Sequence, residues 1–294
     1  MTRSLSLARI AGLALALPAV FIMAGFAADR PAGTAAQKTV TLAYRFEAGK
    51  TISYRETGTR TQNMDVQGQV MTTTTTSGLD FTITPKGPKG SDFLLGIVVN
   101  AGKSDSQTIQ GDISADFSSV IGKGFDMVLS PLGKEVDVSG ASVLMIGSPA
   151  GGEQDMTSSF QAFFPDLPDK PIKVGDAWPS EDVIVSKQGG GETKTQFANL
   201  NTLDGFETVD GMECARIKVV STGTMSGTID QGGMSMGLAM KIDSQNIWYF
   251  AVKEGLFLKS DGKATLTGTI DVAQAGITIA MTGETAGQVV VVKK

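Results

Sequence analysis

Apolar and polar residues alternate along most of this chain, and short turns rich in glycine separate the alternating runs. The pattern is clearest in "MSMGLAMKI", Met234–Ile242, where Met, Met, Leu, Met and Ile occupy every second position. A period of two places successive side chains on opposite faces, so each run predicts a strand with one buried face. Several runs extend over about 15 residues, roughly 50 Å of strand. Strands of that length favour a mainly β fold: one large curved antiparallel sheet or incomplete barrel.

Two segments follow a helical period instead. In residues 112–121 apolar side chains recur at i, i+4, i+7 and i+8, and residues 153–164 repeat that spacing up to Pro165. Both patterns are typical of short amphipathic helices. We expect one or two such helices to pack against the concave face of the sheet, where their apolar stripes can be buried.

The N-terminal residues predict export. Residues 1–27 contain Arg3 and Arg9, then an apolar run, and end in small residues before Ala28. This order is typical of a cleaved secretory signal peptide, so we expect the mature chain in the periplasm or outside the cell. The apolar run is near the lower limit for a membrane span, and no transmembrane span is expected after cleavage.

The remaining chain is predicted to form one domain. A flexible segment at 28–38 precedes a single β-rich domain at 39–294. Five of the ten prolines lie between Pro149 and Pro179, which indicates a rigid connector. We therefore expect two β-rich halves, 39–139 and 180–292, joined by a helix and proline connector at 140–179.

Composition excludes several classes of function. Without the two signal arginines the chain has 25 − 2 = 23 Lys and Arg against 30 Asp and Glu, a net charge of 23 − 30 = −7. This acidic balance argues against binding to nucleic acid or to an anionic membrane surface. The chain has no histidine and one cysteine, Cys214, so it offers no set of nitrogen and sulfur ligands for a transition metal. No metal or other cofactor is expected.

One stretch has the spacing of a hydrolase nucleophile elbow, Gly233-x-Ser235-x-Gly237. Such a serine needs a base to accept its proton and a sharp strand-to-helix turn to expose it. The chain has no histidine to act as that base, and Ser235 lies inside an alternating run. We therefore expect Ser235 to be an ordinary strand residue, and no catalytic residue is predicted.

The methionine-rich run is the strongest candidate for a binding surface. Methionine is flexible and polarizable, so it suits both irregular apolar ligands and ordinary cores. Phenylalanines on the second predicted helix could cover a cavity beside that run or pack as an ordinary helix stripe. The candidate ligand-binding residues are Met234, Met236, Leu238, Met240, Phe160, Phe163 and Phe164.

Several longer stretches resemble known families. The order of signal peptide, β-rich half, connector and second β-rich half with "IWYFAVKEGLFLKSDG" (Ile247–Gly262) resembles the lipoprotein-carrier superfamily, the LolA/LolB-like and LppX-like proteins. Three other stretches resemble uncharacterised secreted bacterial proteins of a domain of unknown function: "FFPDLPDKPIKVGDAW" (Phe163–Trp178), "GKGFDMVLSPLGKEVDVSG" (Gly122–Gly140) and "DGMECARIKVVSTGTMSG" (Asp210–Gly227). The carrier resemblance implies a sheet curled around apolar cargo.

Together these features predict an exported, non-enzymatic protein. Its expected partner is a lipid or another apolar small molecule in the concavity of the sheet, since apolar surface left uncovered usually has a partner. One alternative is a scaffold with a filled core that binds a protein partner at the cell envelope. A hydrolase using two carboxylates is another, and nothing in the spacing picks out such a pair.

Overall fold

The computed structural model describes residues 38–109, 111–147, 153–188, 190–231 and 234–292. Strands account for 73 % of these residues and helices for 4 %, which confirms the mainly β fold. The predicted signal peptide at 1–27 lies outside the described residues, as does the segment at 28–38 except for Lys38.

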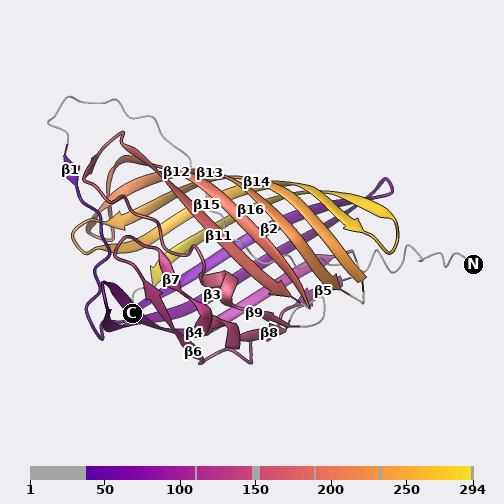
Figure 1. Ribbon diagram of the computed structural model, residues 1–294, viewed down its shortest axis with the longest axis horizontal. Coiled ribbons are helices and arrows are strands. Elements are labelled where there is room, and N and C mark those ends of the chain that lie inside the picture. The colour runs from indigo at the N-terminus through magenta and orange to yellow at the C-terminus, as the bar shows by residue number, and fades with distance from the viewer. Residues whose placement is uncertain (1–37, 110, 148–152, 189, 232–233, 293–294) are drawn as a thin grey trace, which may run out of the picture.

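One antiparallel sheet of fourteen strands dominates the described part of the chain (Figure 1). Its order is β7-β6-β4-β3-β2-β16-β15-β14-β13-β12-β11-β9-β8, and β5 also pairs with β4. In chain order its strands are β2 (Ile52–Val66), β3 (Gln69–Lys89), β4 (Asp92–Thr108), β5 (Gly111–Ser114), β6 (Gly124–Leu129), β7 (Glu135–Asp137), β8 (Met145–Gly147), β9 (Glu153–Asp155), β11 (Ala177–Gln188), β12 (Gly191–Val209), β13 (Met212–Gln231), β14 (Met234–Ala251), β15 (Leu256–Val272) and β16 (Ile277–Val292). A separate pair joins β1 (Thr39–Val40) to β10 (Ile172–Lys173).

The two predicted halves share this one sheet. The first long strand, β2, pairs antiparallel with the last strand, β16, and places Met64 opposite Met281. Backbone hydrogen bonding therefore continues from the N-terminal to the C-terminal half without a break. The predicted connector at 140–179 contributes β8, β9 and β10 and the two short helical turns.

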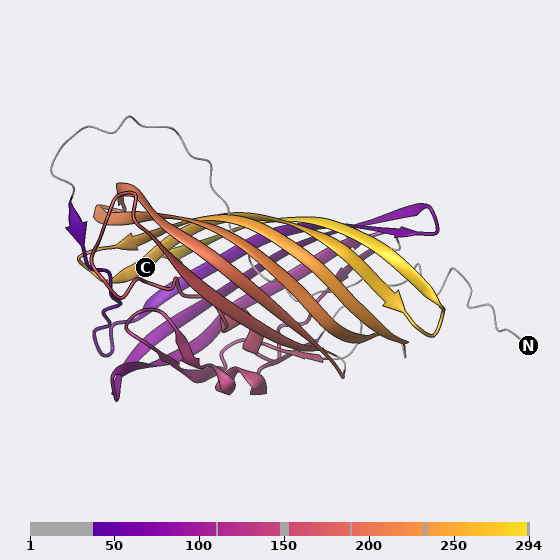
Figure 2. The same ribbon diagram turned by 45° about the horizontal axis from the view of Figure 1, so that its top comes forward.

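The sheet curls into a half-barrel, as Figures 1 and 2 show. Its two edges meet at one point, where Asp116, just after β5, forms an isolated antiparallel bridge with Gly147 of β8. The two backbone hydrogen bonds of this bridge are both 3.1 Å long. Elsewhere in the described residues β7 does not pair with β11, which is an edge of the sheet except where β9 pairs with it at Gln188.

The gap between these edges is covered by Met156–Leu167, which we call the strap. On one side the amide of Val185 in β11 donates to Oε1 of Gln161 at 2.7 Å. On the other side the amide of Phe164 donates to Oε1 of Glu135 in β7 at 2.7 Å. The strap thus satisfies a backbone donor of one edge strand and binds a side chain of the other.

Burial follows the predicted alternation closely. On β14 the side chains of Met236, Leu238 and Met240 are buried, whereas those of Ser235 and Lys241 are exposed. The methionines therefore face the interior of the curl. Ser235 is an exposed strand residue, as its period predicts.

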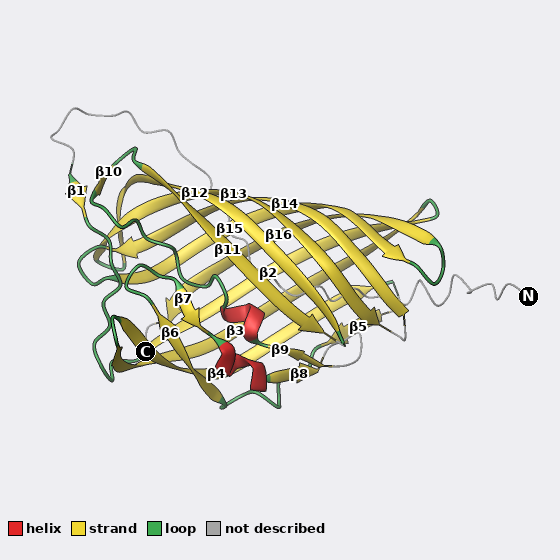
Figure 3. Ribbon diagram, viewed as in Figure 1, coloured by secondary structure: helices red, strands yellow, loops and turns green. Residues whose placement is uncertain are grey.

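The helices differ from the prediction. Residues 112–121, expected to be helical, contain β5 and then turns, because pairing of β5 with the end of β4 replaces the local helical period. Phe117 lies against Gly102 of β4, where a Cβ would overlap its ring. Residues 153–164 form β9 and a single turn, α2 (Thr157–Phe160), and the 3-10 turn η1 (Ser139–Val143) was not predicted. Figure 3 shows both turns beside the sheet edges.

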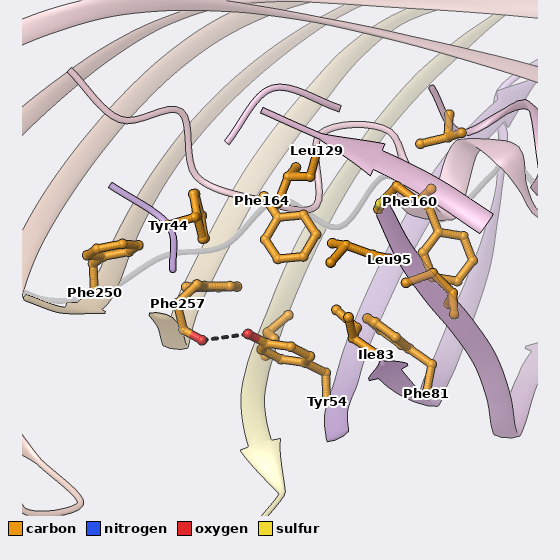
Figure 4. Packing of buried hydrophobic residues seen from close by; sticks show 14 of the residues in the cluster. Tyr44, Tyr54, Phe81, Ile83, Leu95, Leu129, Phe160, Phe164, Phe250 and Phe257 are labelled. Atoms are coloured by element: carbon orange, nitrogen blue, oxygen red, sulfur yellow. Dashed lines mark hydrogen bonds between the residues drawn. The ribbon is translucent and has the colours of Figure 1, made fainter. Parts of the chain in front are cut away.

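The described residues contain three apolar clusters, and the two larger ones line the inner face of the curl. The aromatic cluster surrounds Tyr54, Phe81, Phe160 and Phe257, and Figure 4 shows the hydroxyl of Tyr54 donating to the carbonyl of Phe257 at 2.7 Å. The methionine cluster consists of aliphatic residues, Phe197 and six buried methionines: Met64, Met71, Met225, Met236, Met240 and Met281. Strap residue Phe160 packs edge-to-face on Phe81 with ring centroids 5.2 Å apart.

We expect Phe160→Ala to lower the free energy of unfolding by about 3–5 kcal/mol, because Phe160 is fully buried and its removal leaves a cavity. Urea titration followed by circular dichroism measures this change. Val70→Ala is the matched control, since Val70 is 63 % exposed and its truncation should change stability by less than about 0.5 kcal/mol. Equal effects of the two substitutions would contradict the assignment of Phe160 to the core.

Candidate functional site

Between the two apolar clusters the inner face of the sheet becomes polar. On β14 the inward positions change from Met240 and Ile242 to Ser244 and Asn246. Strand pairing sets Ser244 opposite Ser221 of β13. We call the buried polar residues of this region the polar band: Glu56, Asn199, Ser221, Ser244, Asn246 and Ser260.

A cavity of about 80 Å³ lies against the polar band. The strap contributes one wall, with Gln161, Ala162 and Phe163 among its residues. Aromatic side chains contribute much of the rest: Phe163, Phe197, Trp248 and Phe257. A cavity of this size has room for a few water molecules or a small polar molecule.

Three polar atoms at this cavity have no hydrogen-bond partner within the described part of the chain. They are Oε2 of Glu56, Oγ of Ser244 and Oδ1 of Asn246, on side chains that are 3 %, 4 % and 7 % exposed. A buried polar atom without a partner costs about 1–3 kcal/mol, so such atoms are rare in native proteins. Three around one cavity leave hydrogen bonds that water molecules or a ligand in the cavity would complete.

Burial also changes the chemistry of Glu56. Loss of hydration raises the pKa of its carboxyl group to about 8. The group is therefore mostly protonated and neutral at pH 7. Arg60 also faces inward four residues further along β2, and burial lowers the pKa of its guanidinium to about 10, so it keeps its charge.

The strap is held over the cavity from several directions. Lys134 lies 3.3 Å from Asp166 at the end of the strap and 3.5 Å from Asp182 of β11. The amide of Leu167 donates to the carbonyl of Leu132 at 2.7 Å. Gly133, at φ +99°, approaches the strap so closely that a Cβ would overlap the carbonyl oxygen of Pro165. These contacts fix the wall that carries Phe163.

The sequence candidates lie in two different places. Met236, Leu238 and Met240 are buried in the methionine cluster, and Met234 is partly buried beside them. Phe160 and Phe164 are buried in the aromatic cluster. Phe163 is the candidate residue that lines the cavity. The phenylalanines therefore do not cover the methionine strand, and a ligand-binding role for the methionine face stays a prediction.

Sequence reasoning missed Glu56, Ser244 and Asn246. A signal was present on β14, because Ser244 and Asn246 continue the same period-two face as Met240 and Ile242 with polar side chains. A polar residue on the buried face of a strand marks either a hydrogen-bond network or a site.

Within the described residues, no group of three or more Cys, Asp or Glu side chains is placed to hold a metal ion. None of the helices in the same residues is long and apolar enough to cross a membrane.

Comparisons with known proteins give little guidance. No protein-family model matches the chain, and no curated protein matches it. Among solved structures, the crystal structure of Pseudomonas aeruginosa OccK7 (OpdD) matches over 83 % of this chain and 99 % of that one, with 10 % sequence identity and a TM-score of 0.22. A likeness at that TM-score carries no argument about fold or function.

The raised pKa of Glu56 makes stability depend on pH. Between about pH 4.5 and 8 the folded protein keeps a proton that the unfolded chain has lost, so stability falls as pH rises. We expect Glu56→Gln to remove this decline, up to about 1.4 kcal/mol per pH unit, and to be more stable than wild type at pH 8. Urea unfolding at several pH values measures it.

Glu284→Gln is the matched control, because Glu284 is an exposed carboxylate on the outer face of the neighbouring strand β16. Its stability curve should run parallel to that of wild type. A Glu56→Gln curve that also runs parallel would show that Glu56 ionises normally in the folded protein.

Proposed function

We propose that this protein is an exported, non-enzymatic binding protein that encloses a small polar molecule between the two apolar clusters of its curled sheet. The observation that carries the proposal is the set of three unpartnered oxygens around one interior cavity. Export is proposed from the signal-like residues 1–27. The non-enzymatic role is proposed because the chain has no histidine and no recognisable nucleophile motif with a base.

A lipid cargo is less well supported than a small polar one. Pockets for drug-sized ligands have volumes of about 300–1,000 Å³, whereas the interior cavity measures about 80 Å³. The methionine face, proposed from the sequence as the lipid-binding surface, is closed by its own cluster. An acyl chain would therefore need much of the interior to rearrange.

A filled scaffold is the second candidate, and the small size of the cavity favours it. In that case a few water molecules would satisfy the polar band, and the function would depend on a protein partner at the cell envelope. The two candidates differ in what occupies the cavity: a bound small molecule in the binding protein, and water in the scaffold.

Ser244→Val tests the difference, because it replaces an unpartnered hydroxyl with an apolar group of similar size. If the protein is a binding protein, wild type purified under gentle conditions should release a small molecule on denaturation, detected by mass spectrometry. The variant should contain less of it by at least about tenfold, which corresponds to the loss of one hydrogen bond to a buried group.

Ser235→Val is the matched control, since Ser235 lies on the exposed face of the same strand. It should leave the small-molecule content unchanged. If wild type contains no small molecule, and Ser244→Val raises stability with no other effect, the scaffold is the better description.

A further inference from the structure

The lining of the interior cavity is acidic and aromatic. Two carboxyl side chains, Glu56 and Asp182, line it, and neither lysine nor arginine is among its lining residues. Asp182 accepts a hydrogen bond from Nδ2 of Asn199 at 2.6 Å and lies 3.5 Å from Lys134. Oε2 of Glu56 has no hydrogen-bond partner within the described residues.

The aromatic residues add a second preference for positive charge. Phe163, Phe197, Trp248 and Phe257 come from the strap and from three strands, and all of them line the same cavity. The face of an aromatic ring carries negative charge density and attracts cations, most strongly where water is excluded. Trp248 and Phe163 are only partly buried, so their surfaces can still be covered by a ligand.

The unpartnered atoms favour a cation that can donate hydrogen bonds. Oε2 of Glu56, Oγ of Ser244 and Oδ1 of Asn246 are all oxygens that can accept hydrogen bonds. A primary ammonium group has three N–H donors and no acceptor. Of the three acceptors, Glu56 is the one that can carry a negative charge, so it is the one that pairs with the ammonium group.

We propose that the cavity binds a small organic ammonium ion, with Glu56 as its anionic partner and the aromatic side chains around its alkyl part. The inference rests on the proposed binding function and names its ligand class. The volume of about 80 Å³ restricts the ion to a few non-hydrogen atoms. Ethylammonium is a suitable probe, and ethanol is its uncharged analogue of similar size.

Binding of the cation requires Glu56 to ionise. In the empty protein burial raises the pKa of Glu56 to about 8, and a bound cation lowers it again. Binding near pH 7 should therefore release a proton from Glu56. The neighbours of Glu56 across the sheet, Leu79 and Val289, carry no charge, so Arg60 on its own strand and Asp182 on the cavity wall are the other charged groups to consider.

The two tryptophans of the chain provide the readout. Trp248 lines the cavity, whereas the indole N–H of Trp178 donates to the carbonyl of Asp166 outside it at 3.0 Å. NMR spectra of the full chain should show the Trp248 indole signal shifting saturably with ethylammonium, while the Trp178 signal stays in place. Ethanol should bind at least about tenfold more weakly, because it lacks the charge.

Substitution of Glu56 and a pH series test whether Glu56 is the residue that pairs with the cation. Glu56→Gln should weaken ethylammonium binding at least about tenfold, and the control Glu284→Gln should not change it. The affinity of wild type should rise from pH 6 to pH 8 and then level off, whereas that of Glu56→Gln should stay constant. Circular dichroism confirms that each variant is folded.

Three outcomes would overturn the inference. Ethanol binding as tightly as ethylammonium, or ethylammonium binding unchanged in Glu56→Gln, would show that the site does not select a cation, although the proposed binding function would survive. Failure of both probes at concentrations up to tens of millimolar, together with no small molecule in the purified protein, would reject the inference and the proposed function together.

Discussion

Strands of up to 21 residues give this sheet a long apolar face, and the fold is stable only when that face is buried away from water. A flat sheet would expose that face, and the burial of apolar surface is the dominant favourable contribution to folding. Curling solves the problem with the sheet's own side chains, because opposite parts of the inner face then pack on one another. The edges approach as a consequence, which explains why a single bridge at Asp116 and one strap are enough to enclose the interior.

The alternation of residues made the sheet predictable, because the period of two is a local property that the curl preserves. Met236, Leu238 and Met240 face inward as their spacing predicts. The helix expected at 112–121 failed because a long-range contact outweighed a local period: residues 111–114 complete the edge of β4 instead. The sequence does not show which strand edge will lack a pairing strand, so the strand β5 could not be predicted.

The cavity could not be predicted either, since it depends on which strands face one another across the curl. Glu56 is on β2 and Asn246 on β14, with β16 and β15 between them in the sheet. Their distance in sequence gives no hint that both line one space. The polar positions themselves were visible in the sequence, but only the register of the strands shows that Ser221 and Ser244 belong to the same band.

The polar band lowers the stability of the fold, because it places polar side chains at buried positions where apolar ones would be more favourable. Alanine or valine in place of Ser244 would continue the apolar face without an unpartnered hydroxyl, and leucine in place of Asn246 would extend the cluster. Native sequences that keep such costly groups usually do so where binding or chemistry needs them. The two large clusters on either side supply the stability that lets three unpartnered oxygens persist between them.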